Sequence, residues 1–325
     1  MTVEFTCELG EDDAPEDVPR KRSESFGPNA TYLELTADGA SIETGDLRSV
    51  RTVVGDVAAS EVASEELGRD IAIWGTYSYT YPVDDRAYSE EKPLSGRIDR
   101  VAFDRHTGEA VDCCGTTTQS GMDTETGAGA EPEEMVFEGQ YSKLPFNTQQ
   151  QQFWDGTLQQ ATPLEFEEEE EVEGLGTYRF RQTIEPTDVD ELTTADGEPK
   201  TQVPGSLVGE PDEGSAPADR MYANTRTLWI EPETGVIVKA EEEQLTTLDI
   251  DGEPAATITE LVIAYDEETV AANADTYGSL ATQLRLIRST VPLVGLILGQ
   301  LLMVAGVLLL RRDRSTRRGR RVAEA

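Results

Sequence analysis

The residue types that most often carry catalysis form no organised pattern in this chain. Its 325 residues include 64 aspartates and glutamates, three cysteines and a single histidine, His106. Because a pair of carboxylates can be found at any spacing among so many, paired acids carry no information about general acid–base chemistry here. His106 lies in the turn of a predicted hairpin, and a similar turn later in the chain has Glu233 at the matching position. We therefore interpret His106 as a tolerant surface position and expect no catalytic residues and no enzyme.

Motifs that bind nucleotides, acyl groups or metals are also missing from the sequence. It contains neither a Gly-x-Ser-x-Gly nucleophile elbow nor a Gly-x4-Gly-Lys phosphate loop. Residues 249–260 place acids at positions 1, 3 and 12 of a calcium-type loop, but position 6 is Pro254, where the sharp turn needs glycine. We expect a hairpin turn there, no metal and no cofactor. An envelope hydrolase is the least favoured of the functions considered.

The three cysteines are Cys7, Cys113 and Cys114. Sequence neighbours rarely bridge each other because the two-residue ring is strained. The candidate disulfide therefore joins Cys7 to Cys113 or to Cys114 outside the cell and leaves one thiol free. A zinc site is disfavoured, since two adjacent cysteines, one remote cysteine and one histidine do not have zinc-ligand spacing.

A long uncharged stretch dominates the C-terminal end of the chain. Residues 291–310, VPLVGLILGQLLMVAGVLLL, carry no charge, and twenty helical residues at about 1.5 Å each can cross a hydrocarbon core of about 30 Å. Seven arginines follow between Arg311 and Arg321. A basic flank of this kind normally stays in the cytoplasm, so we predict a single-pass cell-membrane protein in the bilayer, with its ectodomain outside. The arginines that set this orientation are Arg311, Arg312, Arg314, Arg317 and Arg318.

One face of the predicted membrane helix carries small residues. Gly295 and Gly299 are four residues apart, and Gly306 lies two turns further on. Small residues with this spacing let another helix approach closely, and Gln300 at mid-depth can hydrogen-bond across such a contact. Glycine also occurs in membrane helices that have no packing role. The candidate partner of this face is a second copy of the chain or another membrane helix.

The charge of the chain is strongly asymmetric. Residues 1–284 hold 62 acidic and 18 basic residues, a formal charge of −44, whereas the remaining 41 residues carry +7. Such an excess is self-repulsive unless salt screens it. The acids are spread along the sequence and lysine is scarce, which is typical of a halophile's surface. A surface that binds a cationic ligand would instead have its acidic residues clustered. Nucleic acid is excluded as a partner because its phosphates need an exposed basic patch.

The N-terminal segment carries no export signal. Residues 1–18 contain no apolar run that could serve as a signal peptide or an anchor. An external domain that precedes the membrane helix needs an export signal. We expect that an upstream hydrophobic segment is missing from this start; the alternative is an acidic domain exported without one. Residues 1–25 are polar, rich in acids and proline, and expected to be disordered. Asn29 begins the only N-glycosylation sequon, Asn-Ala-Thr, and is a candidate acceptor.

The middle of the chain is predicted to be β structure that is duplicated. Residues 71–81 alternate apolar and polar, and residues 101–111 form a hairpin around a Thr-Gly turn. Residues 176–181 match 75–80, and residues 228–238 match 101–111. Two matches in the same order predict repeat halves at about 71–141 and 173–265, with an inserted flexible loop at 187–218. The alternative is chance similarity between hairpins that prefer the same turn.

These observations predict a mainly β (α+β) fold. A duplicated antiparallel hairpin and meander domain should span residues 26–265, with one helix-like segment in its front half at 56–68. A juxtamembrane helix at 266–290, a transmembrane helix at 291–310 and a cytoplasmic basic tail at 311–325 should follow. We expect Pro292 in the first turn of the membrane helix, where its missing N–H costs little.

Several stretches of the chain together resemble one known family. Residues 99–113, the LPFNTQ and FWD motifs within 144–155, residues 174–182 and residues 226–238 resemble, in that order, the PorA-type porin family of actinobacteria. The likeness runs from about Arg51 through the final helix. It implies an extracytoplasmic β-rich domain with a membrane helix at each end, so the absent N-terminal helix agrees with a missing upstream segment. The resemblance implies no catalytic or binding residues.

The sequence as a whole predicts a membrane-anchored extracytoplasmic protein of a halophile, with a non-enzymatic role in binding or in the cell envelope. The alternative is a PorA-like channel built from oligomerised membrane helices. A membrane barrel needs lipid-facing apolar rows of about 9–11 residues in every strand. The predicted strands are instead short, acidic and separated by polar loops.

Overall fold

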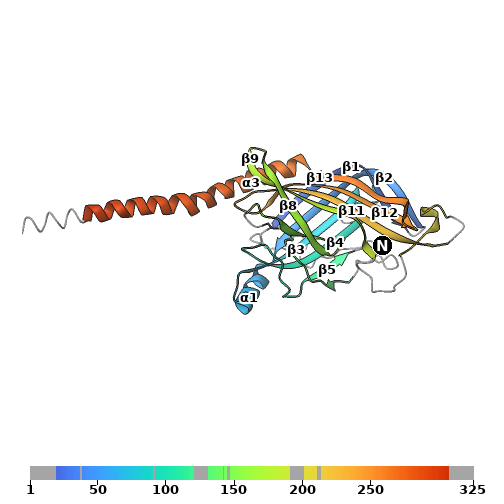
Figure 1. The fold of residues 1–325 in the computed structure, drawn as a ribbon, viewed down its shortest axis with the longest axis horizontal. Coiled ribbons are helices and arrows are strands. Elements are labelled where there is room, and N and C mark those ends of the chain that lie inside the picture. Colours follow the sequence, from blue (N-terminus) through green and yellow to red (C-terminus); the bar gives the residue numbers. More distant parts are fainter. Residues whose placement is uncertain are drawn as a thin grey trace, which may run out of the picture.

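A β body and one long helix that projects from it make up the molecule (Figure 1). The computed structural model describes residues 20–36, 39–90, 92–120, 131–141, 143–144, 147–190, 201–210 and 214–306. The fold is mostly β with a C-terminal helix, as the sequence predicts. Residues 1–19 of the segment predicted to be disordered lie outside the described residues, as does the basic tail. Residues 20–25 of that segment instead form the start of β1, where they pair with β2.

The strands form a 13-stranded antiparallel sheet. Its order is β6-β5-β4-β3-β2-β1-β13-β12-β11-β9-β8-β7, with β10 paired to β11 beside this path. Most neighbours in the sheet are also neighbours in the chain, and the pairing of β1 with β13 joins the two halves. The strands are β1 (Arg20–Thr36), β2 (Gly39–Gly55), β3 (Ile71–Pro82), β4 (Ser95–Asp104), β5 (Thr117–Ser120), β6 (Glu133–Glu134), β7 (Gln151–Asp155), β8 (Gln160–Val172), β9 (Leu175–Asp188), β10 (Thr201–Val203), β11 (Ala216–Ile230), β12 (Ile237–Ile250) and β13 (Glu253–Tyr265).

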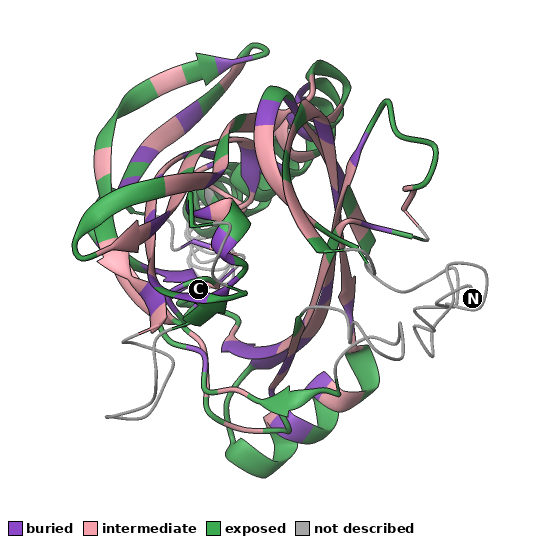
Figure 2. Ribbon diagram, turned by 90° about the vertical axis from the view of Figure 1, so that its right-hand side faces the viewer, coloured by how far each residue is buried: buried purple, intermediate pink, exposed green. Residues whose placement is uncertain are grey.

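Single bridges between β4 and β7 close the sheet into a barrel. Phe103 of β4 bridges Ala110, Glu109 bridges Gln140, and Gln140 bridges Phe153 of β7 in the parallel sense. The strands accordingly run round a ring when the molecule is viewed end-on (Figure 2). Residues far apart in the chain therefore meet at this seam of the barrel.

The two segments predicted to be repeats have similar strand pairing and turns. β3 pairs with β4, which ends in the turn 104–108; β9 pairs with β11, which ends in the turn 231–235. In the first turn the Gly108 N–H donates to the Asp104 carbonyl at 2.9 Å, and in the second the Gly235 N–H donates to the Glu231 carbonyl at 2.8 Å. In each turn the first acidic side chain also accepts from backbone N–H groups of the turn. The local chemistry of the two turns is the same.

The register of the two halves differs, and the insertion is not purely a loop. Phe103 pairs with Ala72, whereas its counterpart Ile230 pairs with Tyr178, the counterpart of Tyr77. Within 187–218, β9 continues to Asp188, and β10 is followed by the short helix η1 (Gly205–Leu207). This part of the insertion is ordered because its apolar side chains pack with the ends of β11, β12 and β13: Val203, Val208, Ala216, Ala218, Leu248 and Ile258.

Two helices flank the sheet. Helix α1 (Val57–Leu67) begins at Asp56, whose side chain accepts from the Ala59 N–H, and ends at Gly68 in the left-handed region. Its Ala63 packs on the buried Ile71 and Ile73 of β3, which confirms the helix-like segment predicted at 56–68. Helix α3 (Glu267–Arg285) begins at Asp266 and packs against the barrel before it leaves the body.

The junction between α3 and the membrane segment differs from the prediction. The helix runs without a break from Glu267 to Gly306 and is long and apolar enough to cross a membrane. Pro292 therefore lies inside a helix and not in the first turn of a new one. It has no N–H to donate, and in a regular α-helix its ring would clash with the carbonyl of Arg288. The helix relieves this with a π turn at Leu286–Thr290, in which the Val291 N–H donates to the Leu286 carbonyl.

Candidate functional site

Apolar side chains fill one end of the barrel, near the turn 231–235. Strands β7, β8, β9, β11 and β12 and the segment 143–144 each contribute to this cluster. The buried members are Leu144, Phe153, Leu164, Phe180, Leu228, Ile230 and Ile237. Burial of such side chains stabilises each by about 1.5–3 kcal/mol, so this packing holds strands from distant parts of the chain together. This end of the barrel interior is therefore a packed core.

A buried ion-pair network forms the next layer of the interior. The Arg226 guanidinium donates to Glu242 Oε1 at 2.9 Å and to Asp155 Oδ2 at 3.2 Å. The Asp155 side chain is only 1% exposed and that of Arg226 11%. Burial alone would raise the pKa of Glu242, but the charge and hydrogen bonds of Arg226 hold it at about 2. The three groups tie β7, β11 and β12 to one another.

A second polar cluster lies at the barrel seam. Asp99 of β4 accepts hydrogen bonds from Arg97 Nε at 2.8 Å, from the Thr118 hydroxyl at 2.6 Å and from the Tyr141 hydroxyl at 2.5 Å. Arg97 also donates to the carbonyl of Gly156 at 2.9 Å, just beyond β7. Burial, together with the nearby Asp99 charge, raises the pKa of Tyr141. Asp99 already accepts hydrogen bonds from three side chains. This arrangement suits a structural role better than proton transfer.

The turn residues His106 and Glu233 lie at the end of the body from which the long helix projects. We call the part of this helix between the body and Val291 the stalk. His106 Nε2 lies 2.9 Å from Asp70 Oδ2, and both side chains are mostly exposed. Glu233 instead pairs with Arg285 at 3.4 Å and with Arg288 at 3.9 Å, so it fastens the stalk to the body. Among the residues that the structure describes, no group of three or more His, Cys, Asp or Glu side chains is placed to hold a metal ion.

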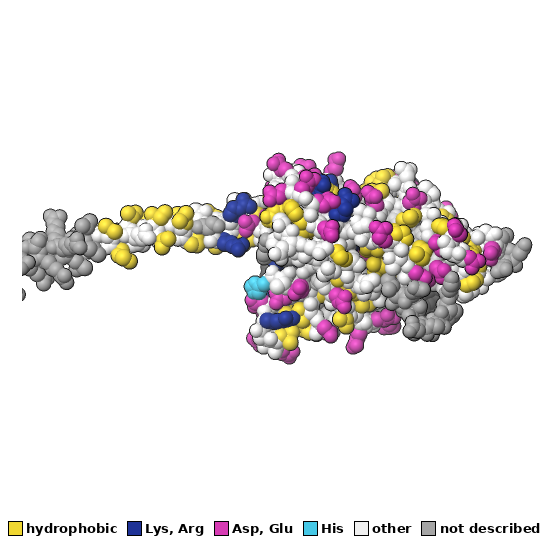
Figure 3. Space-filling model, in the orientation of Figure 1, with side chains coloured by type: hydrophobic (Ala, Val, Ile, Leu, Met, Phe, Trp, Pro, Cys, Tyr) yellow, Lys and Arg dark blue, Asp and Glu magenta, His cyan; other side chains and the backbone are white. Residues whose placement is uncertain are grey.

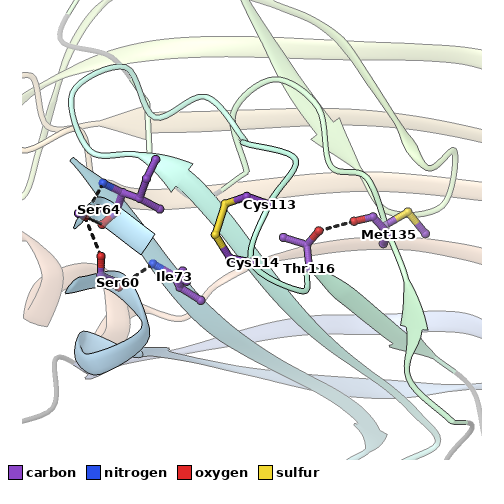
Figure 4. Close-up of a disulfide and its surroundings, with 8 residues drawn as sticks. Ser60, Ser64, Ile73, Cys113, Cys114, Thr116 and Met135 are labelled. Carbon is purple, nitrogen blue, oxygen red and sulfur yellow. Dashed lines mark hydrogen bonds between the residues drawn. A yellow bond between two sulfur atoms is a disulfide. The ribbon is translucent and has the colours of Figure 1, made fainter. Parts of the chain in front are cut away.

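The cysteine prediction is wrong in its pairing. The structure joins the neighbours Cys113 and Cys114, and Cys7 lies outside the described residues (Figure 4). The local backbone accommodates this ring because Cys114 has φ +66° and Gly115 has φ +68°. The loop is also anchored on its far side, where the Thr116 hydroxyl donates to the carbonyl of Met135 at 2.7 Å.

The residues predicted to pack the membrane helix lie on an uncovered surface. Nothing approaches within 4 Å of a Cβ built on Gly295, Gly299 or Gly306, and Gln300 is exposed. The orientation-setting arginines Arg311, Arg312, Arg314, Arg317 and Arg318 lie outside the described residues. Asn29 is exposed in the bulge of β1, with φ +52° and its N–H donated to Asp46. The structure does not bring these groups together into one site.

A β body followed by an uncovered helix that is long and apolar enough to cross a membrane defines the class of protein. The family model of porin PorA matches residues 13–308, and the chain therefore belongs to the PorA porin family. This confirms the resemblance drawn from the sequence motifs.

Two relatives illustrate the match. Porin PorA of Corynebacterium amycolatum is 30% identical over 184 residues, which cover 49% of this chain and 46% of the relative. Porin PorA of Corynebacterium resistens is 25% identical over 283 residues, which cover 69% of this chain and 68% of the relative. The match thus spans about half the length of the first relative and about two thirds of the second.

Proposed function

We propose that this chain is a channel-type protein of the cell envelope in which the C-terminal helices of several copies form the path across the membrane. The relatives are named porins, which supports a channel over an enzyme. The observation that carries the proposal is the contrast between the body and the helix. The body is packed at one end of its interior and carries charged side chains outside, whereas the helix beyond Thr290 presents only uncharged side chains.

The outer face of the body is built for water. Acidic side chains are spread over it (Figure 3). Arg179 of β9 pairs with Glu167, Glu168 and Glu170 of β8 at 2.6–3.0 Å, all partly exposed. Strands of a membrane barrel would carry apolar rows at these positions. A body of this kind stays outside the bilayer, and one helix cannot enclose a pore, so the channel requires several copies.

The position of the body and its salt requirement complete the proposal. The arginine-rich end of the chain stays in the cytoplasm, which leaves the body on the outer side. Its formal charge of −44 over residues 1–284 fits a protein that folds in molar salt. The body has no catalytic activity in this account, because the acids of its two buried clusters, Glu242 with Asp155 and Asp99, are held by ion pairs and hydrogen bonds.

Conductance of the purified full chain in planar bilayers tests the proposal. In molar salt we expect discrete steps of current, and Gly299→Leu should abolish them because the added side chain separates the helices. Ala305→Leu places the same side chain about 80–120° round the helix from the glycines and should conduct like the parent. Melting curves of the same protein from about 0.1 M to several molar salt should show stability rising with salt.

Silent bilayers that contain correctly inserted protein would contradict the channel. Equal currents from the Gly299 and Ala305 variants would contradict the glycine contact. A melting temperature that does not change with salt would contradict the halophile interpretation.

A further inference from the structure

Large apolar side chains are exposed on the stalk between the body and the membrane. Leu280, Leu284 and Ile287 are 43%, 44% and 64% exposed. Their spacing of four and then three residues places them on one side of the helix. An exposed apolar row on a segment that stands in water marks an interaction surface.

The lipid bilayer cannot cover the two leucines of this row. Leu284 and Leu280 lie seven and eleven residues before Val291, which is about 10 and 16 Å along a helix. The headgroup region extends only about 5–8 Å beyond the hydrocarbon on each side. Arg285 and Arg288 are paired with Glu233 of the body, so the hydrocarbon cannot rise past them.

The body of the same chain does not cover the row either. The side of α3 that faces the barrel is marked by its buried residues Val270, Ala274 and Ala281. Leu280 and Leu284 lie roughly 60–100° round the helix from this side, at about 100° per residue. Near the start of α3 the body also covers Asn273, which lies on the leucine flank and donates to the Val238 carbonyl at 3.0 Å. Further along the helix the body leaves Leu280 and Leu284 exposed.

The π turn aligns this row with the glycine face of the membrane segment. In an uninterrupted α-helix Gly295, Gly299 and Gly306 would lie roughly 75° away from the leucines. A π turn adds one residue to a turn and so rotates everything beyond it back by about 100°. The glycines are thereby brought to within about 30° of the leucine row, and one continuous uncharged stripe crosses the membrane boundary.

We propose that this stripe, which we call the stalk seam (Leu280, Leu284 and Ile287, continued by the three glycines), is where a second copy of this chain docks in parallel. The partner must be a helix that carries apolar side chains both above and inside the membrane at the same depths. A second copy meets this condition because its own helix crosses in the same direction. The proposal deepens the proposed function, on which it rests, by naming the partner and the contact above the bilayer.

Charge on the stalk supports self-association. Thr276 and Gln283, which flank the seam on the side away from the arginines, are uncharged. Arg285 and Arg288 both pair with Glu233 of their own body, which reduces the repulsion between two facing seams. The acidic bodies repel one another, and salt lowers that repulsion while it leaves the apolar contact in place. The seam therefore associates best under the ionic conditions that the body requires.

Disulfide cross-linking in membranes tests the seam. In full-length protein with Cys7→Ser, Leu284→Cys should give a species of twice the chain mass after mild oxidation. Thr282→Cys is the matched control, since residue 282 is exposed on the side of the helix opposite the seam. We expect a cross-linked fraction several-fold higher for Leu284→Cys than for Thr282→Cys.

The outcomes separate the seam from the channel. Equal cross-linking at positions 282 and 284, or a product whose mass is not twice that of the chain, would overturn the seam even if the parent conducts. Strong cross-linking at position 284 in a protein that gives no current would leave the seam in place and remove the channel.

Discussion

Replacing Arg226 by methionine should lower the free energy of unfolding by about 3–5 kcal/mol, because the buried Glu242 and Asp155 then lose their cation. The carboxylates are held in place by this guanidinium, which is 11% exposed. Denaturant unfolding of the full chain, at fixed molar salt and neutral pH, measures the effect.

Arg181→Met is the matched control for this variant. Arg181 pairs with Glu167 at 2.7 Å, but its side chain is 44% exposed. A pair in that position contributes about 0–1 kcal/mol. Equal losses in the two variants would contradict the assignment of the Arg226 network as the charged core of the barrel.

Gly235→Ala should cost about 3 kcal/mol, from a strained backbone and a displaced neighbour. Gly235 has φ +71°, and a Cβ built on it would collide with the Leu144 carbonyl oxygen. The Leu144 N–H also donates to the Gly235 carbonyl at 3.1 Å, so a shift at this contact disturbs the apolar cluster that contains Leu144. Thermal and denaturant unfolding report the loss.

Gly252→Ala separates the two contributions. Gly252 has φ +81° but nothing within 4 Å of a built Cβ, so it carries the backbone strain alone and should lose about 1 kcal/mol. Similar losses of unfolding free energy at Gly235 and Gly252 would mean that the segment containing Leu144 can shift away from the added Cβ at no cost. In that case the turn does not clamp it.

The local part of the fold follows from sequence patterns. The alternation in residues 71–81 predicts β3, and the Thr-Gly pairs predict the two matching turns. The first two strands are much longer than their apolar content indicates, at 17 residues each. Many of their side chains are Arg, Ser, Thr or Glu, and β1 has a bulge between Phe26 and Thr31, so neither strand shows a clean alternation. Pairing on both sides stabilises them in spite of their polar residues.

The non-local features could not be predicted from one sequence. Barrel closure rests on single bridges through Gln140, which no periodicity marks. The Arg226–Glu242 pair cannot be picked out by residue type among 62 acids, although the β11–β12 register places the two directly opposite each other. The adjacent disulfide depends on a positive φ at Cys114 that residue type does not indicate.

Only the glycine part of the stalk seam could be predicted from the sequence. Gly295, Gly299 and Gly306 stand out by their spacing. Leu284 fits the apolar face of an amphipathic helix, and only the structure shows that Leu280 and Leu284 are exposed. The π turn before Pro292, which aligns the two sets, is a backbone adjustment with no sequence period of its own.

Protection from protease in intact cells tests the central claim, that the body stands outside and the C-terminal end inside. We expect added protease to remove the body and to spare a tag placed after Ala325. A tag that is cleaved from outside, or a body that is protected in intact cells and cleaved only after lysis, would contradict it.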